Sequence, residues 1–343
     1  MRYLVAMSGG VDSSAAAYLL LKQGHCVEGA IMRLSPFSDG SDVRSAEAVC
    51  RELGINLRVL DLRAEFERYV IGPFCDQYLR CRTPNPCVFC NNKLKFGAFL
   101  DHALAEGFDG MATGHYAAIT ERNGRYAVSV AACAEKDQSY FLWDLDQRAL
   151  SKTVFPLCGA GSKDEVRRLV KDAGLPVYSR GDSQDICFVP DGEYGDFIRE
   201  HTGADQPEGD FVDEDGKVLG RHKGLLNYTI GQRRYLNVAA GRRIFVIGKD
   251  AEKNTVTLGD GDRLYTTHVR AEGVRLQLYP DLTEPARLTA KIRYGKNAVP
   301  ATVTAKDGGE ADVVFDEPVR AAAPGQSVVF YDGNTVAGGG FIC

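Results

Sequence analysis

Small polar residues follow a short apolar run close to the N-terminus. The run Tyr3 to Ala6 predicts a strand, and the apolar pattern from Ala15 to Gln23 predicts a helix. Between them lies the string Met7-Ser8-Gly9-Gly10-Val11-Asp12-Ser13-Ser14. Such a turn directs backbone N–H groups and the positive end of a helix at one point, and its glycines leave room for a phosphate group. The alternative is a glycine turn that only closes a strand against a helix.

Two better-known phosphate loops do not fit this string. No Gly-Lys-Ser/Thr follows at Walker spacing, and no third glycine completes a dinucleotide fingerprint. The remaining pattern, S-G-G-x-D-S, resembles the PP-loop of enzymes that split ATP to AMP and pyrophosphate. Because Asp12 can hold Mg²⁺ or cap the helix, ATP and Mg²⁺ are the expected cofactors.

Two cysteines three positions apart form the second feature that could do chemistry. A C-x-x-C pair, here Cys87 and Cys90, indicates a metal site, a redox pair or an activated nucleophile. Tetrahedral zinc needs a second pair, and the sequence has none at that spacing, so no zinc site is expected. Cys90 precedes Lys93 at a predicted helix start, where the helix dipole and the cation would lower its thiol pKa. Cys90 is therefore the first candidate nucleophile.

Cys187 ends a polar turn that contains Asp182 and Asp185. Their negative charges would raise the pKa of its thiol, and by itself Cys187 would be assigned to a buried strand over 186–189. Cys75 lies on the apolar side of a predicted helix and is expected in the core.

Strands and helices alternate over the first half of the chain. Predicted strands and helices cover 26–34, 42–53, 55–62, 63–79, 93–106, 110–113 and 163–173. This alternation predicts a parallel sheet with helices on both faces and ligands at the carboxyl ends of its strands. Two prolines and three asparagines between Cys81 and Asn92 predict an exposed loop, and Asn123-Gly124 predicts a hairpin turn.

The character of the sequence changes beyond Thr202, where short β segments are separated by Gly, Asp and Asn. The predicted fold class is α/β: an N-terminal PP-loop domain with a parallel sheet, resembling the adenine nucleotide alpha hydrolases, followed by two small all-β domains. Expected boundaries are 1–201 for the ATP-binding catalytic domain, 202–266 for a central β domain and 267–343 for a C-terminal β-barrel. Arginines of the central domain form either a phosphate-binding patch or a solvated face: Arg221, Arg233, Arg234, Arg242 and Arg243.

Composition narrows the class of protein. The 343 residues carry a formal net charge of −5, which argues against a uniformly basic surface for nucleic acid but allows a local basic patch. No stretch of about 18 apolar residues occurs, so no membrane association is expected. The N-terminus enters a strand without a signal-peptide pattern, and the expected location is the cytoplasm. Ten cysteines in that reducing compartment favour free, catalytic or metal-bound thiols over disulfides.

Together these motifs give the chain a specific resemblance that covers nearly its whole length. It is similar to the bacterial tRNA-specific 2-thiouridylases, a family that places sulfur on the wobble uridine of certain tRNAs. The resemblance is carried by Met7 to Ser14, Arg82 to Asn91, Thr113 to Tyr116, Lys136 to Leu142, Asp182-Ser183, Ile186 to Phe188, Thr229 to Arg233 and Pro324 to Gly333. Several motifs in one order occur by chance far less often than any one of them.

The resemblance implies roles for individual residues. Cys90 would be the nucleophile and Cys187 the persulfide carrier. ATP would be bound by Ala6, Met7, Ser8, Gly9, Gly10, Val11, Asp12, Ser13, Met32 and Gly114. tRNA would be bound by Asn85, Pro86, Cys87, His115, Lys136, Asp137, Gln138, Arg293, Tyr294 and Gln326. The implied partners are tRNA and a persulfide donor, either a cysteine desulfurase or a sulfur-relay protein.

The implied reaction begins with ATP-dependent adenylation of the uracil C2 oxygen, because that oxygen is otherwise a poor leaving group. A persulfide on Cys187 then attacks C2 and expels AMP. Cys90 forms a disulfide with Cys187, which a reductant resets. A second route is open: Cys87, Cys90 and Cys187 could hold a [4Fe–4S] cluster that binds sulfide.

The chain departs from the family pattern at several positions. Val130 and Cys133 stand where an arginine and an aspartate are usual, and Cys81 replaces a glycine. These departures leave open a paralogue that acts on another RNA. Two other classes also remain: a PP-loop enzyme that adenylates a small molecule, and an RNA-binding module without catalysis.

Overall fold

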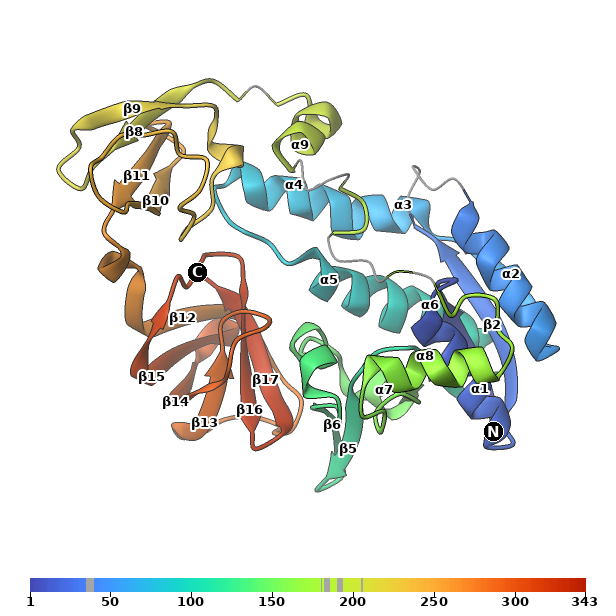
Figure 1. Cartoon of the computed structure of the whole chain (residues 1–343). Helices are drawn as coiled ribbons and strands as arrows, with labels where there is room; N and C mark the ends of the chain where they lie inside the picture. The colour runs from blue at the N-terminus through green and yellow to red at the C-terminus, as the bar shows by residue number, and fades with distance from the viewer. Residues whose placement is uncertain (35–39, 180, 182–185, 190–193, 205) are drawn as a thin grey trace.

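The computed structural model describes residues 1–34, 40–179, 181, 186–189, 194–204 and 206–343 (Figure 1). In its N-terminal part, strands form a sheet in the order β3-β2-β1-β4-β7, and every neighbouring pair in that order is parallel. The strands are β1 (Arg2–Met7), β2 (Cys26–Arg33), β3 (Leu57–Asp61), β4 (Gly110–Ala112) and β7 (Thr153–Val154). The predicted parallel sheet is confirmed.

Both faces of this sheet are covered, so β1 is buried and apolar from Tyr3 to Met7. Successive side chains of a strand point to opposite faces, and Val5 and Met7 accordingly belong to one core while Leu4 and Ala6 belong to another. Helices over the Val5 face are α1 (Val11–Lys22), α2 (Ser41–Leu53) and α8 (Lys163–Asp172). The predicted helices at these places are confirmed.

The Leu4 face is covered by a continuous helical run over 86–105. It comprises α5 (Pro86–Phe89), the π-helix η2 (Cys90–Ala98) and α6 (Phe99–Ala105). The predicted loop is confirmed over 81–85, but the chain is helical from Pro86, so the prediction of a loop up to Asn92 with a helix only from Lys93 is wrong there. Pro86 takes the first helical position, which needs no N–H donor, and the Asn85 side chain caps the helix by accepting from the Cys87 N–H at 3.2 Å.

A second helical run lies along the top of the molecule in Figure 1. It comprises α3 (Arg63–Phe66), the π-helix η1 (Glu67–Ile71) and α4 (Gly72–Leu79), which confirms the helix predicted there. Beside it lies α9 (Tyr194–Thr202), a helix that no sequence pattern indicates. Among the described ranges, no helix has the length and apolar character needed to cross a membrane.

The strand predicted over 186–189 is also wrong, because these residues form a turn. Phe188 is buried there and packs with Phe74 and Phe197 from the two flanking helices. The apolar character of the segment therefore reflects an anchor in a core, and no strand pairing is involved.

A hairpin lies between β4 and β7 in the chain, at the predicted Asn123-Gly124 turn. It consists of β5 (Ala118–Arg122) and β6 (Arg125–Ser129), and short helix α7 (Gln147–Ser151) follows later in the chain. Asn123 and Gly124 have φ angles of 54° and 73°, the left-handed conformation that a tight hairpin turn requires. Ser129 of β6 pairs with Thr335 far along the chain, so the hairpin joins the sheet of the C-terminal barrel.

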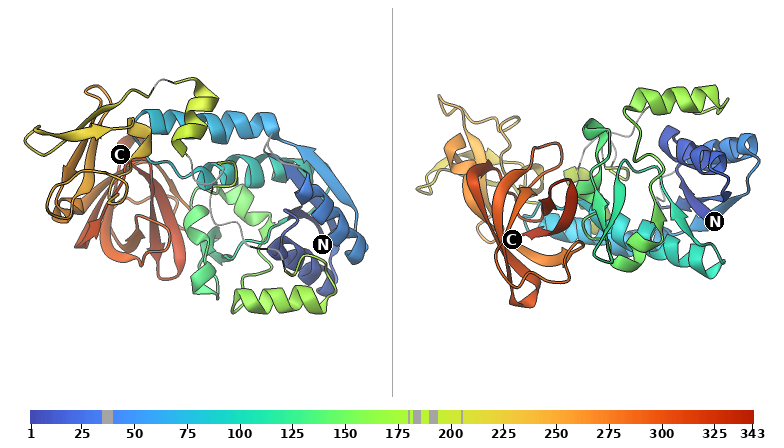
Figure 2. Two further views of the ribbon diagram at one scale, coloured as in Figure 1. Left: turned by 45° about the horizontal axis from the view of Figure 1, so that its top comes forward. Right: turned by 90° about the horizontal axis from the view of Figure 1, so that it is seen from below.

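The C-terminal half is built from strands, as expected. The central sheet has the order β10-β11-β8-β9 and contains β8 (Gly209–Val212), β9 (Val218–His222), β10 (Phe245–Asp250) and β11 (Thr255–Gly259). The barrel has the order β12-β15-β14-β13-β16-β17 and closes where β12 also pairs with β17. Its strands are β12 (Tyr265–Leu276), β13 (Ala286–Lys291), β14 (Val299–Lys306), β15 (Glu310–Arg320), β16 (Ser327–Asp332) and β17 (Thr335–Ile342). Figure 2 shows both at the end of the molecule opposite the parallel sheet. The exact domain boundaries stay predictions.

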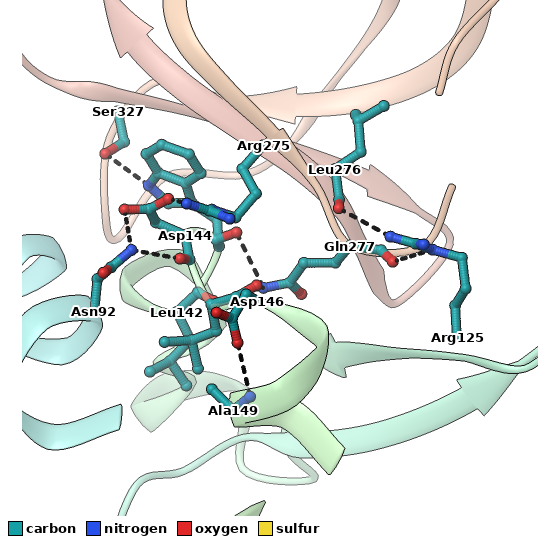
Figure 3. A network of polar contacts seen from close by, with 12 residues as sticks. Asn92, Arg125, Leu142, Asp144, Asp146, Ala149, Arg275, Leu276, Gln277 and Ser327 are labelled. Carbon is teal, nitrogen blue, oxygen red and sulfur yellow. Dashed lines mark hydrogen bonds and ion pairs between the residues drawn. The ribbon is translucent and has the colours of Figure 1, made fainter. Parts of the chain in front are cut away.

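A buried amide fixes the barrel to the N-terminal part (Figure 3). Gln277, directly after β12, is fully buried and donates to the carbonyl oxygens of Leu142 at 2.7 Å and Trp143 at 3.0 Å. Its own side-chain oxygen accepts from the Val128 N–H at 2.9 Å. One side chain thus satisfies backbone groups on two separate segments of the N-terminal part.

Charged groups extend this contact. Arg275 donates to Asp144 at 2.7 Å, and Asn92 of the helical run 86–105 donates to the carbonyl oxygen of Asp144 at 2.7 Å (Figure 3). The indole of Trp143 donates to the Ser327 hydroxyl at 3.0 Å. The barrel is therefore linked through Asp144 to the helical run that carries the cysteine pair.

Replacement of Gln277 by leucine should lower the free energy of unfolding by about 2–4 kcal/mol, because it removes the hydrogen bonds that its amide makes to two carbonyl groups and one N–H in a buried site. Urea unfolding measures this change. The control Gln23→Leu alters an exposed glutamine and should change stability by less than about 0.5 kcal/mol. Equal stability of the two variants would contradict the bracing role of Gln277.

Candidate active site

The phosphate-loop string forms the turn between β1 and α1. Gly9 has a φ of 67°, in the left-handed region that favours glycine. The Ser13 hydroxyl accepts from the Ser8 N–H at 3.1 Å and donates to the Gly10 carbonyl at 3.2 Å. Ser14 donates to the same carbonyl at 2.8 Å. Ser13 and Ser14 thus shape the turn from within, whereas the side chain of Ser8 is exposed.

Strand β4 ends directly against this turn. A Cβ atom on Gly114 would lie 2.6 Å from the carbonyl carbon of Asp12 and 2.7 Å from the backbone nitrogen of Ser13. Backbone atoms cannot move aside as a flexible side chain can, so the position requires glycine. Met32 lies near the carboxyl end of β2, two strands from β4 in the same sheet. The roles of these residues in ATP binding stay predictions.

Two side chains that no sequence motif assigns to the loop hold the Asp12 carboxylate. Lys163 donates to its two oxygens at 2.7 and 2.6 Å, and the Tyr116 hydroxyl donates to one of them at 2.9 Å. Lys163 is the first residue of α8, which packs beside α1. Because nothing in the sequence relates position 163 to position 12, only the fold reveals the contact.

Three cysteines gather near the start of the helical run 86–105. Cys87 and Cys90 lie three positions apart and share one side of the helix. Phe188 anchors the neighbouring Cys187, since its ring packs edge-on against Phe74 at 5.2 Å between centroids, in the core cluster that also contains Cys90. Residues 182–185, which include the aspartates expected beside Cys187, lie outside the described residues.

The thiol pKa values differ from the prediction for Cys90. Burial raises the pKa of Cys90 to about 11, and the neighbouring thiols of Cys187 and Cys87 add to the rise. The expected low pKa is therefore wrong, since Cys90 lies one turn inside the helix and away from its positive end. Cys87 and Cys187 have exposed side chains, yet the protein around them still raises the pKa of each thiol by desolvation.

A cation that opposes this rise is Lys95, which sequence patterns do not single out. Its charge lowers the pKa of all three thiols. Lys93, the cation expected in this role, acts on Asp144 and lines a separate hollow of about 460 Å³. In a π-helix each N–H bonds five residues back, so Lys95 lies one π-turn after Cys90. The residue types alone do not predict this hydrogen-bond register.

His115 connects the thiols with the phosphate loop. It follows Gly114, and its ring packs between Phe96 of the helical run and Phe155, with centroids 5.7 and 6.0 Å away. Its Nδ1 lies 2.7 Å from the Thr113 hydroxyl. Burial, with a smaller effect of Lys95, lowers the pKa of His115 well below its usual range, so the ring is neutral at pH 7.

Several residues predicted to contact tRNA are engaged inside the protein. Asp137 is buried, and its carboxylate accepts from two backbone N–H groups and one hydroxyl. Gln138 accepts from the Tyr116 N–H at 3.0 Å, and Gln326 donates to the Thr83 carbonyl at 2.8 Å. Their contacts with tRNA stay predictions, and each also has a structural role.

Other residues in this group present surface to solvent. Cys87 and Arg293 are exposed, and Lys136 is partly exposed. Tyr294 is 42% exposed and packs against Phe141 with 4.6 Å between ring centroids. These side chains are available to a large ligand in a way that Asn85 and Pro86, both buried at the helix start, are not.

The described residues contain no group of three or more His, Cys, Asp or Glu side chains placed to hold a metal ion. Cys87 and Cys187 lie near Cys90, but this arrangement gives no support to an iron–sulfur cluster. Asp12 is a carboxylate suited to Mg²⁺ beside phosphates, and Lys163 is its present partner.

Substitution of Gly114 by alanine should weaken ATP binding about 10- to 100-fold, because the new Cβ must displace the backbone at Asp12. Isothermal titration with ATP measures the effect. Gly159→Ala is the control, since a Cβ on Gly159 would meet no atom within 4 Å. If both variants bind ATP like the parent, Gly114 does not position the loop.

Substitution of Lys95 by methionine should raise the pKa of the Cys187 thiol, because it removes a cation that stabilises the thiolate. The pH profile of Cys187 alkylation, followed by peptide mass spectrometry, should move to higher pH. Lys93→Met should leave this profile in place. A shift of equal size in both variants would show that general surface charge, and not Lys95, controls the thiols.

Comparison with known proteins places this site in a family. Family models match residues 1–191 (tRNA methyl transferase HUP domain), 195–260 (tRNA methyl transferase PRC-barrel domain) and 266–342 (aminomethyltransferase beta-barrel domain). The chain is 44% identical to the tRNA-specific 2-thiouridylase MnmA of Acetivibrio thermocellus, over 99% of each protein. It is also 44% identical to 2-thiouridylases of Clostridium tetani and Syntrophotalea carbinolica, over 99% of this chain and 96% and 97% of theirs. With matches of this extent, the chain belongs to the family of tRNA-specific 2-thiouridylases.

Proposed function

We propose that this chain is an ATP-dependent tRNA sulfurtransferase that converts the wobble uridine of tRNA into 2-thiouridine. Its relatives are named for this activity and match the chain from end to end. The observation that carries the proposal is the packing of His115, which directly follows Gly114 at the phosphate loop, on Phe96 of the helical run that also contains the cysteine pair. ATP bound at the phosphate loop and a sulfur atom carried by the thiols would therefore act on the same base.

The first step would activate C2 of the uracil ring. The C2 oxygen attacks the α-phosphorus of ATP, pyrophosphate leaves, and AMP becomes the leaving group on C2. The glycine turn and the N-terminus of α1 suit the phosphates, because they offer backbone N–H groups without obstructing side chains. Mg²⁺ would offset phosphate charge when bound, and Asp12 is the carboxylate that fits it.

The second step would use a persulfide on Cys187. Its outer sulfur attacks C2, and AMP leaves with the electron pair of the C2–O bond. The Cys90 thiolate then attacks the inner sulfur of Cys187, which forms the Cys90–Cys187 disulfide and leaves sulfur on C2. A thiol reductant restores both cysteines. The exposed side chain of Cys187 suits sulfur delivery by a donor protein, namely a cysteine desulfurase or a sulfur-relay protein.

The pKa of about 11 gives Cys90 a defined part in this sequence. At neutral pH its thiol is protonated before substrate binds, which protects it from oxidation, since the thiolate is the reactive form. An iron–sulfur route would consume the same thiols as ligands, and no step here passes through a cluster.

The central β domain supplies positive charge for tRNA. Arg233, Arg242 and Arg243 line a hollow of about 600 Å³. A local basic surface suffices for phosphate contacts even when the net charge is negative. tRNA, ATP and reducing thiols are found together in the cytoplasm, where we place the reaction.

Competing functions explain the site less completely. A PP-loop enzyme that adenylates a small molecule would use the phosphate loop but has no need of Cys90 and Cys187. Methyl transfer, which the family-model descriptions mention, needs neither ATP cleavage at a phosphate loop nor a persulfide. Both alternatives predict that loss of the cysteines leaves the reaction intact.

Cys90→Ser and Cys187→Ser should each reduce tRNA thiolation by at least about 10³-fold while ATP binding is unchanged. Incubation with tRNA, ATP, Mg²⁺ and a persulfide source, followed by mass analysis of nucleosides, measures thiolation. The Cys187 variant alone should fail to accept labelled sulfur from the donor. Cys158→Ser, at an exposed cysteine, is the control. Full thiolation by Cys187→Ser would contradict the assignment.

A further inference from the structure

The phosphate loop contains an ion pair at its mouth. Both oxygens of the Asp12 carboxylate accept from Lys163 Nζ, at 2.7 and 2.6 Å, and Tyr116 donates to one of them at 2.9 Å. The Lys163 side chain is 12% exposed and that of Asp12 is 33% exposed. Because the pair is partly shielded from water, its charges interact more strongly than those of a surface pair.

A phosphate group of ATP and a divalent cation interact in opposite ways with the two members of this pair. A phosphate group is repelled by Asp12 and attracted by Lys163, whereas a divalent cation is attracted by Asp12 and repelled by Lys163. An ammonium that contacts both carboxylate oxygens competes with the metal for their lone pairs and repels its charge. The pair must therefore separate if ATP and Mg²⁺ are to use both groups.

We propose that Lys163 is a positioning residue with two partners: it neutralises Asp12 in the free enzyme and moves to a phosphate of ATP when Mg²⁺ takes Asp12. This inference rests on the proposed function, because it concerns the ATP-binding step of that reaction. The flexible stem of lysine permits such a movement. The helix end itself is fixed, since the Ser162 hydroxyl caps it by accepting from the Glu165 N–H at 3.1 Å.

A purely structural role predicts something different. If Lys163 only braces α8 against α1, its loss should lower stability and weaken ATP binding by the same factor with and without Mg²⁺. If it has two partners, the loss should depend on the metal. The response to Mg²⁺ is therefore the readout that separates the two roles.

The experiment measures ATP affinity of the full chain by isothermal titration, in Mg²⁺ and in EDTA. Lys163→Met keeps the length of the side chain and removes its charge. In EDTA, ATP binding should weaken about 10- to 100-fold, because the phosphates then meet the charge of Asp12 with no ammonium to neutralise it. In Mg²⁺ the loss should stay below about fivefold, since the lost contact between Lys163 and a phosphate is offset by the metal, which no longer competes with an ammonium for Asp12.

Asp12→Asn tests the other side of the pair. In EDTA this variant should bind ATP about 3- to 10-fold more tightly than the parent, because Lys163 no longer faces a charged carboxylate. Its affinity should not respond to Mg²⁺. Lys163→Arg should restore most of the binding in EDTA, and Lys171→Met, at an exposed position of α8, is the matched control and should change nothing.

Equal losses for Lys163→Met in both buffers, or no loss in either, would overturn the inference. So would Asp12→Asn binding ATP more weakly than the parent in EDTA. Failure of the proposed function has a different signature, in which the parent protein itself binds no ATP or thiolates no tRNA. If the parent protein does both and the loss in Lys163→Met does not depend on Mg²⁺, the proposed function stands. Only the second partner of Lys163, a phosphate of ATP, is then refuted.

Discussion

The backbone hydrogen bonds of the π-helix Cys90–Ala98 decide which side chains meet at the thiols. Because each N–H reaches five residues back, Lys95 is turned toward the side of the helix that carries Cys90. An α-helix over the same residues would turn Lys95 to a different side. The wider turn also needs a small residue, since a Cβ on Gly97 would lie 2.9 Å from the Asn92 carbonyl oxygen. The effect of Lys95 on the three thiols thus depends on a rare backbone geometry.

Local signals predict most of the fold, whereas contacts between distant elements leave no trace in the sequence. The glycine turn after β1 and the hairpin at Asn123 follow from residue types alone. The helix start at Pro86 does not, because prolines and asparagines suit a loop equally well. Lys95 and Lys163 escape prediction for another reason: one depends on a π register and the other on which helix packs beside α1, and neither changes the apolar pattern. The burial that raises the pKa of Cys90 is likewise a property of the assembled core.

Polar contacts link the barrel to the helical run 86–105 through Asp144. Asp144 contacts Asn92 on the run and Arg275 on the barrel, so a shift of either partner must break a charge-assisted hydrogen bond. Arg82 and Glu272 form a second ion pair across the same contact. A large ligand that contacts the barrel would therefore also be positioned relative to the helix that carries the cysteines.

Ser129 in β6 pairs with Thr335 in β17. During synthesis, β6 therefore leaves the ribosome long before the strand with which it pairs. The two residues lie 206 positions apart. At about 5–20 residues per second, a ribosome needs roughly 10–40 s to cover that distance. Throughout this interval Trp143 lacks the strand it packs on, where Gly339 leaves room for its ring. The nascent N-terminal part therefore lacks one side of the packing around this indole until β17 emerges.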